Sequence, residues 1–441
     1  MTTNSHPNRN ETSLSSRKLY RMIWRWHFYA GLLCIPFILT LAISGSIFLF
    51  KPQIENWIDQ PFHALAVGAT TSTPNQQIQA ALDTLPGSRF VSYQLPKTPR
   101  HAVIIQLIER DIPWLVYINP YNLQVLKVIK KDSQFIELVR SFHGELLAGN
   151  TGSVLVELAG CWAIVLIVSG LYLWWPKQSH GLAGVFYPRV TKGKRLFWRD
   201  MHAVTGMWIS TLALFLLITG LPWALVWGGA FKQVRGWLET PVEQDWTISR
   251  AQEHQHMRHQ ALDKVNLSPL LLASAEQLNL APPATLSISD RQTQQWKLQS
   301  SHQNRMLRSN VWLDGIDGHI VKSENFSERK GIDKVIGIGI SAHEGQLFGW
   351  FNQLLGLVTT SGLILMMASG FILWRRRKPR HSLGAPQAMP DSRAAKVILT
   401  TLVTMALLLP LLMISLIALW ILERLVLTRI PQVRNWLGLT G

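Results

Sequence analysis

Long apolar runs alternate with polar segments along this chain. Five runs are long enough to cross a membrane: His27–Phe50, Gly152–Trp175, His202–Trp227, Trp350–Trp374 and Val397–Leu422. About 20 helical residues span the ~30 Å hydrocarbon core of a bilayer, and backbone groups in lipid must be hydrogen-bonded internally. The pattern therefore predicts five transmembrane helices, with kinks at Pro36, Pro222 and Pro410.

Two long polar segments, 51–142 and 228–342, carry the shorter periodicities of helices and strands. The first is predicted to hold a helix at Pro74–Leu85 and strands at Phe90–Gln94, Ala102–Glu109, Trp114–Ile118 and Gln124–Ile129. The second is predicted to hold a helix at Ser268–Leu278 and strands at Thr285–Ser289, Gln294–Gln299, Ser309–Leu313 and His319–Ser323. We therefore expect a membrane all-α helical bundle that carries two small α+β modules.

The predicted segments follow one another along the chain. They are a basic tail (1–26), a transmembrane helix (27–50), the first module (51–142), a helix with a span (143–175), a basic loop (176–201), a transmembrane helix (202–227), the second module (228–342), a helix with a span (343–374), a basic loop (375–396), a fifth transmembrane helix (397–422) and a C-terminal tail (423–441).

The positive charge is concentrated in three of these segments. The formal net charge is +17, and the segments 1–26, 176–201 and 375–396 hold 18 Lys and Arg against three acidic residues. Basic residues collect on the cytoplasmic side of membrane proteins, so the N-terminal tail is predicted to be cytoplasmic and the two modules to face outward. The charge is thus a topology signal, and nucleic-acid binding is not expected. One conflict remains, because the C-terminal tail is predicted outside yet carries Arg424, Arg429 and Arg434.

The chain contains an internal duplication. A shift of 200 residues superposes the second apolar run on the fourth, and a shift of 175 residues superposes the first on the third. The repeated features are His143 and His343, Ser169-Gly170 and Ser369-Gly370, His27 and His202, Gly31 and Gly206, and Ser44-Gly45 and Thr219-Gly220. Each copy is a helix, an outward segment and a second helix, so the copies should be related by a pseudo-two-fold axis along the membrane normal. The fifth run has no counterpart and is expected to be peripheral.

The duplication singles out four histidines as candidate ligands. His27 and His202 lie at the cytoplasmic ends of their helices, and His143 and His343 lie at the outer ends of theirs. Residues related by the axis should face one another, which predicts an inner pair and an outer pair. Two neutral imidazoles opposed across a bundle are the axial ligands of a six-coordinate b-type haem. We therefore predict two b-type haems, each held by two histidines.

Neighbouring residues extend this predicted site. Gly31 and Gly206 follow the inner histidines by four residues and would leave room for a flat macrocycle on the same helix face. Arg25 and Arg199 are candidate partners for the haem propionates. A lone histidine at an interface is usually a solvated or capping residue, but four at equivalent positions are harder to explain in that way. Two histidines alone are too few ligands for a zinc site.

Other polar residues leave alternatives open. Glu157 lies inside the second apolar run and has Leu357 as its counterpart, so either proton handling or a structural hydrogen bond would explain it. His254, His256 and His259 form a cluster in the second module that we interpret as a solvated helix rather than a metal site. The two cysteines form no CxxCH motif, which excludes covalently attached c-type haem.

Between about residues 20 and 380 the chain resembles the PepSY-associated transmembrane helix family, in particular the inner-membrane ferric-siderophore reductases. The likeness rests on His-x3-Gly at His27 and His202, His-x3-Leu-x-Gly at His143 and His343, the Ser/Thr-Gly pairs, Glu157 and the hairpins at 116–126 and 311–321. The resemblance implies a bacterial inner-membrane protein with two PepSY-like periplasmic modules. It also implies two b-type haems on the four histidines, and reduction of ferric siderophores on the periplasmic side.

We therefore expect an oxidoreductase that relays single electrons from the cytoplasmic side to a ferric siderophore or another Fe(III) chelate. No flavin or nicotinamide domain is visible, so the donor would be a reduced flavin, a quinol or a separate reductase. Two alternatives stay open. The chain would be either a haem subunit that serves another periplasmic redox partner, or a membrane-anchored protein whose modules bind peptides without any redox role.

Overall fold

The computed structural model describes residues 9–176, 181–238, 247–248, 250–386 and 392–439. The predicted basic segments fall partly outside the described residues, at 1–8, 177–180 and 387–391. The described chain divides into two compact units. Unit 1 comprises residues 1–46, 142–239 and 357–441, and unit 2 comprises residues 47–141 and 240–356.

Unit 1 is built from helices. They are α1 (Arg9–Leu49), α5 (Gly149–Trp174), α6 (Lys194–Gly220), the short η3 (Leu221–Trp223), α7 (Leu225–Leu238), α11 (Trp350–Arg377), α12 (Ser392–Leu408), α13 (Pro410–Leu422), the π-helical turn η6 (Glu423–Leu427) and α14 (Pro431–Leu437), with α1 and α11 running on into unit 2. Five helical stretches are long and apolar enough to cross a membrane. The chain is therefore a membrane helical protein.

Proline shapes these helices in two different ways. The predicted breaks at Pro222 and Pro410 are confirmed, since α6 gives way to η3 and α7 near the first and α12 ends just before the second. Pro36, in contrast, lies inside the unbroken α1. Proline removes one backbone donor, but a helix in a packed bundle tolerates that loss where neighbouring groups compensate.

A buried cluster joins the first, second and fourth long helices with the C-terminal ones. It contains Ala30, Cys34, Ile38, Cys161, Trp162, Ala163, Met367, Leu409 and Leu412. The last two residues belong to the segment that was expected to be peripheral. Leu412 is fully buried against this cluster, but most other side chains of α13 are exposed, as expected of a helix at the edge of the bundle.

Unit 2 contains all eight strands. They are β1 (Arg89–Gln94), β2 (Val103–Glu109), β3 (Ile112–Ile118), β4 (Val125–Lys130), β5 (Ala284–Asp290), β6 (Gln295–Ser300), β7 (Ser309–Asp314) and β8 (Ile320–Asn325). Its helices are α2 (Lys51–Ile58), α3 (Pro74–Thr84), α4 (Phe135–Glu145, which ends in unit 1), α8 (Arg250–Gln260), α9 (Pro269–Gln277) and α10 (Gly331–His343). Each predicted strand of the two segments agrees with the observed one to within two residues.

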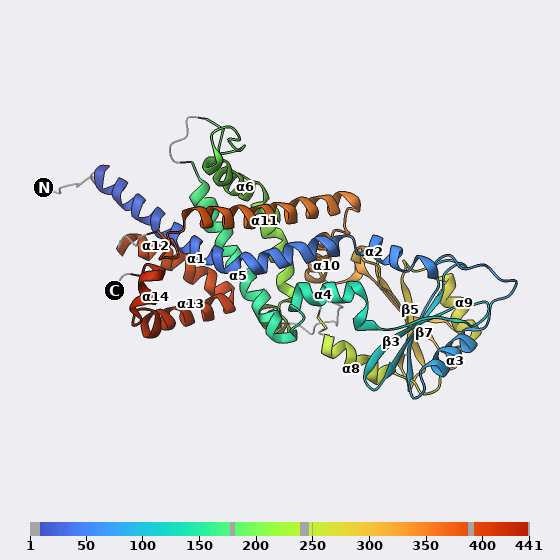
Figure 1. The fold of residues 1–441 in the computed structure, drawn as a ribbon. Helices are drawn as coiled ribbons and strands as arrows, with labels where there is room; N and C mark the ends of the chain where they lie inside the picture. Colours follow the sequence, from blue (N-terminus) through green and yellow to red (C-terminus); the bar gives the residue numbers. More distant parts are fainter. Residues whose placement is uncertain (1–8, 177–180, 239–246, 249, 387–391, 440–441) are drawn as a thin grey trace. The chain divides into compact units, whose positions relative to one another are not determined.

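The two predicted modules are joined through their strands. The strands form one antiparallel sheet in the order β4-β3-β2-β1-β5-β6-β7-β8 (Figure 1). The joint is the pair β1–β5, in which Tyr93 lies opposite Leu286. Pairing the first strand of each half removes two exposed edges, which would otherwise offer unpaired backbone groups to other chains.

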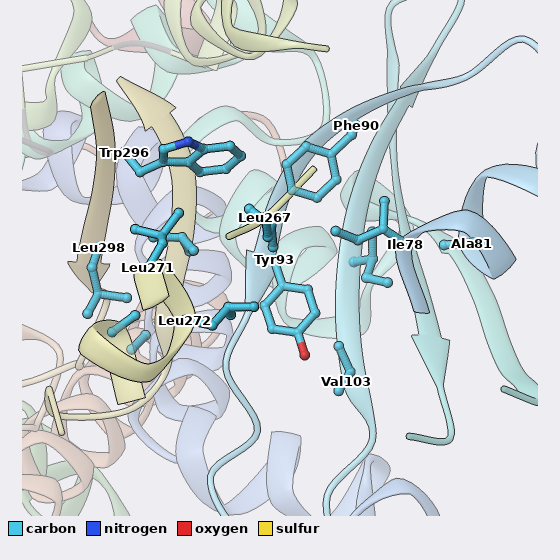
Figure 2. Close-up of a cluster of buried hydrophobic side chains, with 14 of the residues drawn as sticks. Ile78, Ala81, Phe90, Tyr93, Val103, Leu267, Leu271, Leu272, Trp296 and Leu298 are labelled. Atoms are coloured by element: carbon cyan, nitrogen blue, oxygen red, sulfur yellow. The ribbon is translucent and has the colours of Figure 1, made fainter. Parts of the chain in front are cut away.

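One apolar core continues across this joint. Helices α3 and α9, one from each half, pack on the same face of the sheet and bury Ile78 and Leu271 beside Phe90, Tyr93 and Trp296 (Figure 2). The Phe90 and Trp296 rings lie 6.2 Å apart, although they come from different halves. The buried Tyr93 hydroxyl donates to Gln77 Oε1 at 2.8 Å, so its burial leaves no unsatisfied hydrogen-bond donor in the core.

Helix α8 covers part of the opposite face. Met257 packs against Val91 and Ile108. Burial would raise the pKa of the Glu253 carboxyl, but the Lys131 ammonium at 2.7 Å holds it below its usual range. A segment from the second half thus rests on the first half, which ties the two halves together a second time.

The shared core makes a matched prediction. Leu271 is fully buried between the halves, so Leu271→Ala should lower the free energy of unfolding by about 2–5 kcal/mol. Its neighbour Leu270 is 59% exposed, and Leu270→Ala should change stability by less than about 0.5 kcal/mol. Denaturant unfolding of the full chain in detergent, followed by far-ultraviolet circular dichroism, measures both. Equal effects of the two substitutions would contradict a core shared by both halves.

Candidate functional site

The inner histidine pair meets inside unit 1. His27 comes from α1 and His202 from α6, yet their ring centres lie 6.5 Å apart with the ring planes at 84°. They are 175 residues apart in the sequence, and the packing of the long helices brings them together. The duplication therefore located a real juxtaposition, as expected for residues related by a pseudo-two-fold axis.

Each of these rings is held by a serine at a repeated position. His27 Nδ1 lies 2.9 Å from Ser169 Oγ, and His202 Nδ1 lies 3.3 Å from Ser369 Oγ and 3.1 Å from the Met366 carbonyl oxygen. Ser169 and Ser369 belong to the repeated Ser-Gly pairs of α5 and α11. The two copies of the repeat thus build the same contact.

These contacts determine which ring nitrogen carries the proton. Ser169 Oγ donates to the Val165 carbonyl at 2.7 Å, so its oxygen is left to accept from His27 Nδ1–H. His202 Nδ1–H donates to the Met366 carbonyl, which has no proton to offer. In both rings Nε2 then carries the lone pair, which is the form of histidine that binds a metal.

The glycine after each serine gives the ring its space. A Cβ on Gly170 would lie 3.2 Å from His27 Cε1, and one on Gly370 would lie 3.4 Å from His202 Cε1. Both distances leave almost no room for an added methyl group. The Ser-Gly pair is therefore a seat, in which the hydroxyl holds Nδ1 and the bare backbone lets the ring approach.

The outer histidine His143, on α4, has the same kind of seat. Its Nδ1 lies 2.9 Å from Ser44 Oγ, and a Cβ on Gly45 would lie 3.3 Å from its Cε1. Ser44 Oγ donates to the Thr40 carbonyl at 2.7 Å, so it too accepts from the imidazole Nδ1–H. Thr219-Gly220 stands at the repeat-equivalent position in α6, and its contact with His343 stays a prediction. His343 ends α10 in unit 2, and its pairing with His143 stays a prediction.

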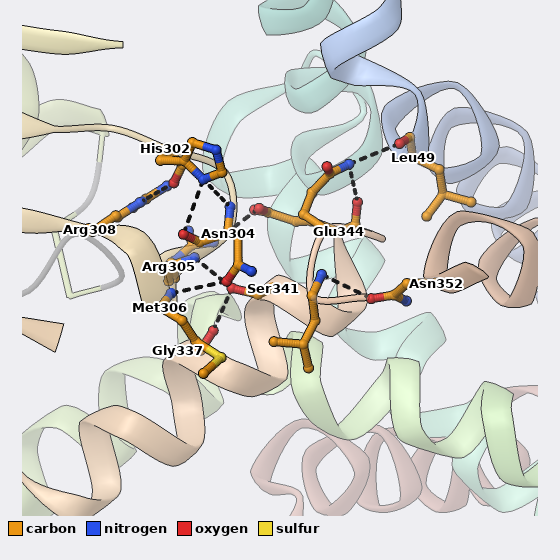
Figure 3. A network of polar contacts seen from close by, with 12 residues as sticks. Leu49, His302, Asn304, Arg305, Met306, Arg308, Gly337, Ser341, Glu344 and Asn352 are labelled. Atoms are coloured by element: carbon orange, nitrogen blue, oxygen red, sulfur yellow. Dashed lines mark hydrogen bonds and ion pairs between the residues drawn. The ribbon is translucent and has the colours of Figure 1, made fainter. Parts of the chain in front are cut away.

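A polar network holds the turn that follows His343 (Figure 3). The buried Arg305 donates from Nη1 to Glu344 Oε2 at 3.0 Å, and its backbone N–H donates to Ser341 Oγ at 2.9 Å. Asn352 Nδ2 donates to the Ala342 carbonyl at 2.9 Å. Residues on both sides of His343 are therefore fastened to the rest of unit 2.

The predicted glycines of the inner site face neighbouring helices. A Cβ on Gly31 would lie 3.8 Å from Leu166 Cδ2, and one on Gly206 would lie 3.1 Å from Met366 Cε. Gly206 therefore permits a close approach of α6 to α11. Its role beside a macrocycle stays a prediction, as does that of Gly31.

The two predicted arginines have protein partners. Arg25 donates from Nη1 to the Pro386 carbonyl at 2.9 Å and lies over the Tyr29 ring. Arg199 donates from Nη2 to Asp200 Oδ1 at 2.7 Å, while its own side chain stays 53% exposed. Pairing of either residue with propionates stays a prediction.

Glu157 caps a helix within the membrane unit. Its two carboxylate oxygens accept from the backbone N–H groups of Val226 and Trp227 at 2.8 and 2.9 Å, at the start of α7. The Pro222 break leaves these donors without partners in their own helix. Of the two readings left open by the sequence, this geometry favours the structural hydrogen bond.

The histidine cluster of α8 does not gather into a ligand set among the described residues. His254 Nε2 lies 3.5 Å from Asp132 Oδ2, which helps to fasten α8 to the first half of the sheet. Among the described residues, Asp314, Asp317 and His319 do have ligand atoms within 4.8 Å of one another, at a hairpin turn. Asp314 Oδ1 there accepts from the turn's own backbone, so these side chains shape the turn.

The serines Ser44, Ser169 and Ser369 contact the candidate histidines but were not predicted as part of the site. Ser44, Ser169 and Ser369 had been recognised as repeats, but no role had been given to them. Their signal was available, because each stands before a glycine at a repeated position. The sequence did not indicate which histidine each serine contacts, since Ser169 and His27, for example, are 142 residues apart.

The region that contains the four histidines and both copies of the repeat also matches a known protein family. Residues 24–377 match the family described as the PepSY-associated TM region. No curated protein matches the sequence. The matched residues cover more than half of the chain and include both copies of the repeat. The chain belongs to the PepSY-associated transmembrane family.

Proposed function

We propose that His27 and His202 bind a b-type haem, and that the protein passes electrons across the bacterial inner membrane to an Fe(III) chelate. The observation that carries this proposal is the inner pair of imidazoles, whose Nε2 atoms are the ones left to bind iron. When bound, such a haem is a one-electron carrier.

The spacing of the inner pair fits an iron between the two rings. Two imidazoles that bound one metal ion through Nε2, with metal–nitrogen bonds of about 2.0–2.1 Å, would have ring centres roughly 6 Å apart. The observed separation is 6.5 Å. Because the serine hydroxyls and the Met366 carbonyl already hold the Nδ1–H groups, little reorganisation of either ring is needed on binding.

The outer pair would hold a second b-type haem by the same chemistry. His143 has the seat that this requires, and Thr219-Gly220 would supply the equivalent seat for His343 by the repeat. Electrons would then move between two sites, one near each membrane face. We also assign the two four-stranded halves of the sheet as PepSY-like modules, which would face the periplasm together with the outer site.

The direction of transfer follows from the charge distribution. The basic segments would keep the N-terminal tail in the cytoplasm, so the inner pair would accept electrons from a reduced flavin, a quinol or a separate reductase. A ferric siderophore or another Fe(III) chelate would take one electron and become the Fe(II) chelate. Hard oxygen ligands hold Fe(II) less strongly because of its lower charge, so iron would be released.

Removal of single histidines separates the two sites. His27→Ala or His202→Ala should lower the haem content from about two to about one per chain, because one axial ligand of the inner haem is lost. His143→Ala or His343→Ala should remove only the outer haem. Haem content per chain is measured by pyridine haemochrome absorbance, with His101→Ala in the sheet unit as the control. Equal loss of both haems in all four variants would contradict the pairing.

Removal of a seat hydroxyl should weaken the site without abolishing it. Ser169→Ala or Ser369→Ala leaves both iron ligands in place but removes a group that orients one of them. Changes of this kind typically lower metal affinity 10–100-fold, and the midpoint potential of the inner haem should shift as well. Redox titration and haem competition measure both effects. Ser210→Ala is the matched control, since this buried hydroxyl donates to the Gly206 carbonyl in its own helix.

Electron delivery to iron can be tested directly. Dithionite-reduced protein mixed with an Fe(III) siderophore should lose its reduced Soret band while a chromogenic chelator detects Fe(II). The His143→Ala and His343→Ala variants should react slowly or not at all. Oxidation only by a periplasmic protein would instead favour a haem subunit for another partner. A preparation with no Soret band would leave a peptide-binding or regulatory role.

A further inference from the structure

The last of the five apolar stretches is the shortest: Pro410–Leu427 has 18 residues, about 27 Å of helix, and it includes the charged Glu423 and Arg424. The apolar part of α12, residues 397–408, has 12 residues and at 1.5 Å per residue spans about 18 Å. Helix α13 has 13 residues, about 20 Å, before the charged Glu423 and Arg424. The chain bends between them, because Leu409 has a non-helical φ of −128° and ψ of 89° and precedes Pro410. A crossing needs about 30 Å of apolar helix.

The bend lies beside the middle of the bundle. Leu409 and Leu412 pack in the cluster that contains Cys161 and Trp162, about midway along α5. The Leu408 carbonyl accepts from the indole N–H of Trp227 at 3.0 Å. This bond satisfies a backbone oxygen at the bend, as a turn at membrane depth requires.

Both arms of the bend return to the same end of unit 1. The Leu383 N–H, in the segment before α12, donates to the Trp436 carbonyl in α14 at 2.8 Å. The Tyr29 hydroxyl donates to the Leu437 carbonyl. The Arg377 guanidinium lies 4.9 Å from the centre of the Trp24 ring, so α11 ends where α1 begins. The segment after α13 is therefore back beside the N-terminal half of α1 (Figure 1).

We propose that α12 and α13 form a re-entrant hairpin, so that the chain crosses the membrane four times and its C-terminal tail lies on the same side as its N-terminal tail. The hairpin enters before Leu399, turns at Leu409–Pro410 and leaves after Leu422. This arrangement removes the charge conflict, because Arg424, Arg429 and Arg434 then join the other basic segments on one side. The inference is independent of the proposed haem chemistry.

Labelling of single introduced cysteines in whole cells tests the hairpin. Gln432→Cys places an exposed thiol in α14, Thr191→Cys places one in the loop between α5 and α6, and Gln292→Cys places one in the sheet unit. The native Cys34 and Cys161 are both buried, so the chain without an introduced cysteine is the background control. A membrane-impermeant maleimide should label Gln292→Cys in intact cells, and should label Thr191→Cys and Gln432→Cys only after permeabilisation.

Each result decides the question. Labelling of Gln432→Cys together with Thr191→Cys supports four crossings. Labelling of Gln432→Cys in intact cells, together with Gln292→Cys, would overturn the hairpin and restore a fifth crossing. A fusion of the last strand of a split green fluorescent protein to the C-terminus gives a second readout, because it becomes fluorescent with a cytoplasmic partner fragment only if the tail is cytoplasmic.

Discussion

The hydrogen bond between an imidazole Nδ1–H and a serine hydroxyl is the interaction on which the candidate site depends. It occurs at His27, His202 and His143, each time to a serine whose own proton is committed to its helix backbone. A serine so committed is an acceptor only, and this determines the tautomer of the imidazole. Without it, either ring nitrogen would be free to point into the bundle, and the rings would have no fixed orientation toward each other.

The seats also explain why a glycine follows Ser44, Ser169 and Ser369. The hydroxyl brings the ring against the helix, and a side chain at the next position would push the ring away again. The serine is thus required for the hydrogen bond and the glycine for close packing. Because the two residues are adjacent, the duplication copied both. The proposed electron transfer needs such rigidity, because an axial ligand that changes orientation changes the electronic properties of its iron.

Duplication has a different consequence in the sheet unit. The two α+β segments are similar in order and length, but neither closes its own core. They share one core through the β1–β5 pair and through α3 and α9, and α8 crosses from one half to the other. Strand pairing between copies joins distant segments of the chain, so the two copies of the repeat depend on each other for stability.

Sequence alone determined the elements and the repeat. Apolar run length gives the long helices, two-residue alternation gives the eight strands, and the shifts of 175 and 200 residues identify the four histidines. These features depend on local periodicity and on identity between copies, and both can be read directly from the order of residues.

The tertiary structure alone decided which groups meet. It paired Ser169 with His27, joined Tyr93 to Leu286, set Glu157 against the start of α7 and bent the last apolar run at Leu409. The physical reason is that these contacts are between distant segments, where many partners have the same local pattern. Hydrogen-bond geometry and close packing select one of them, and neither is visible in the order of residues.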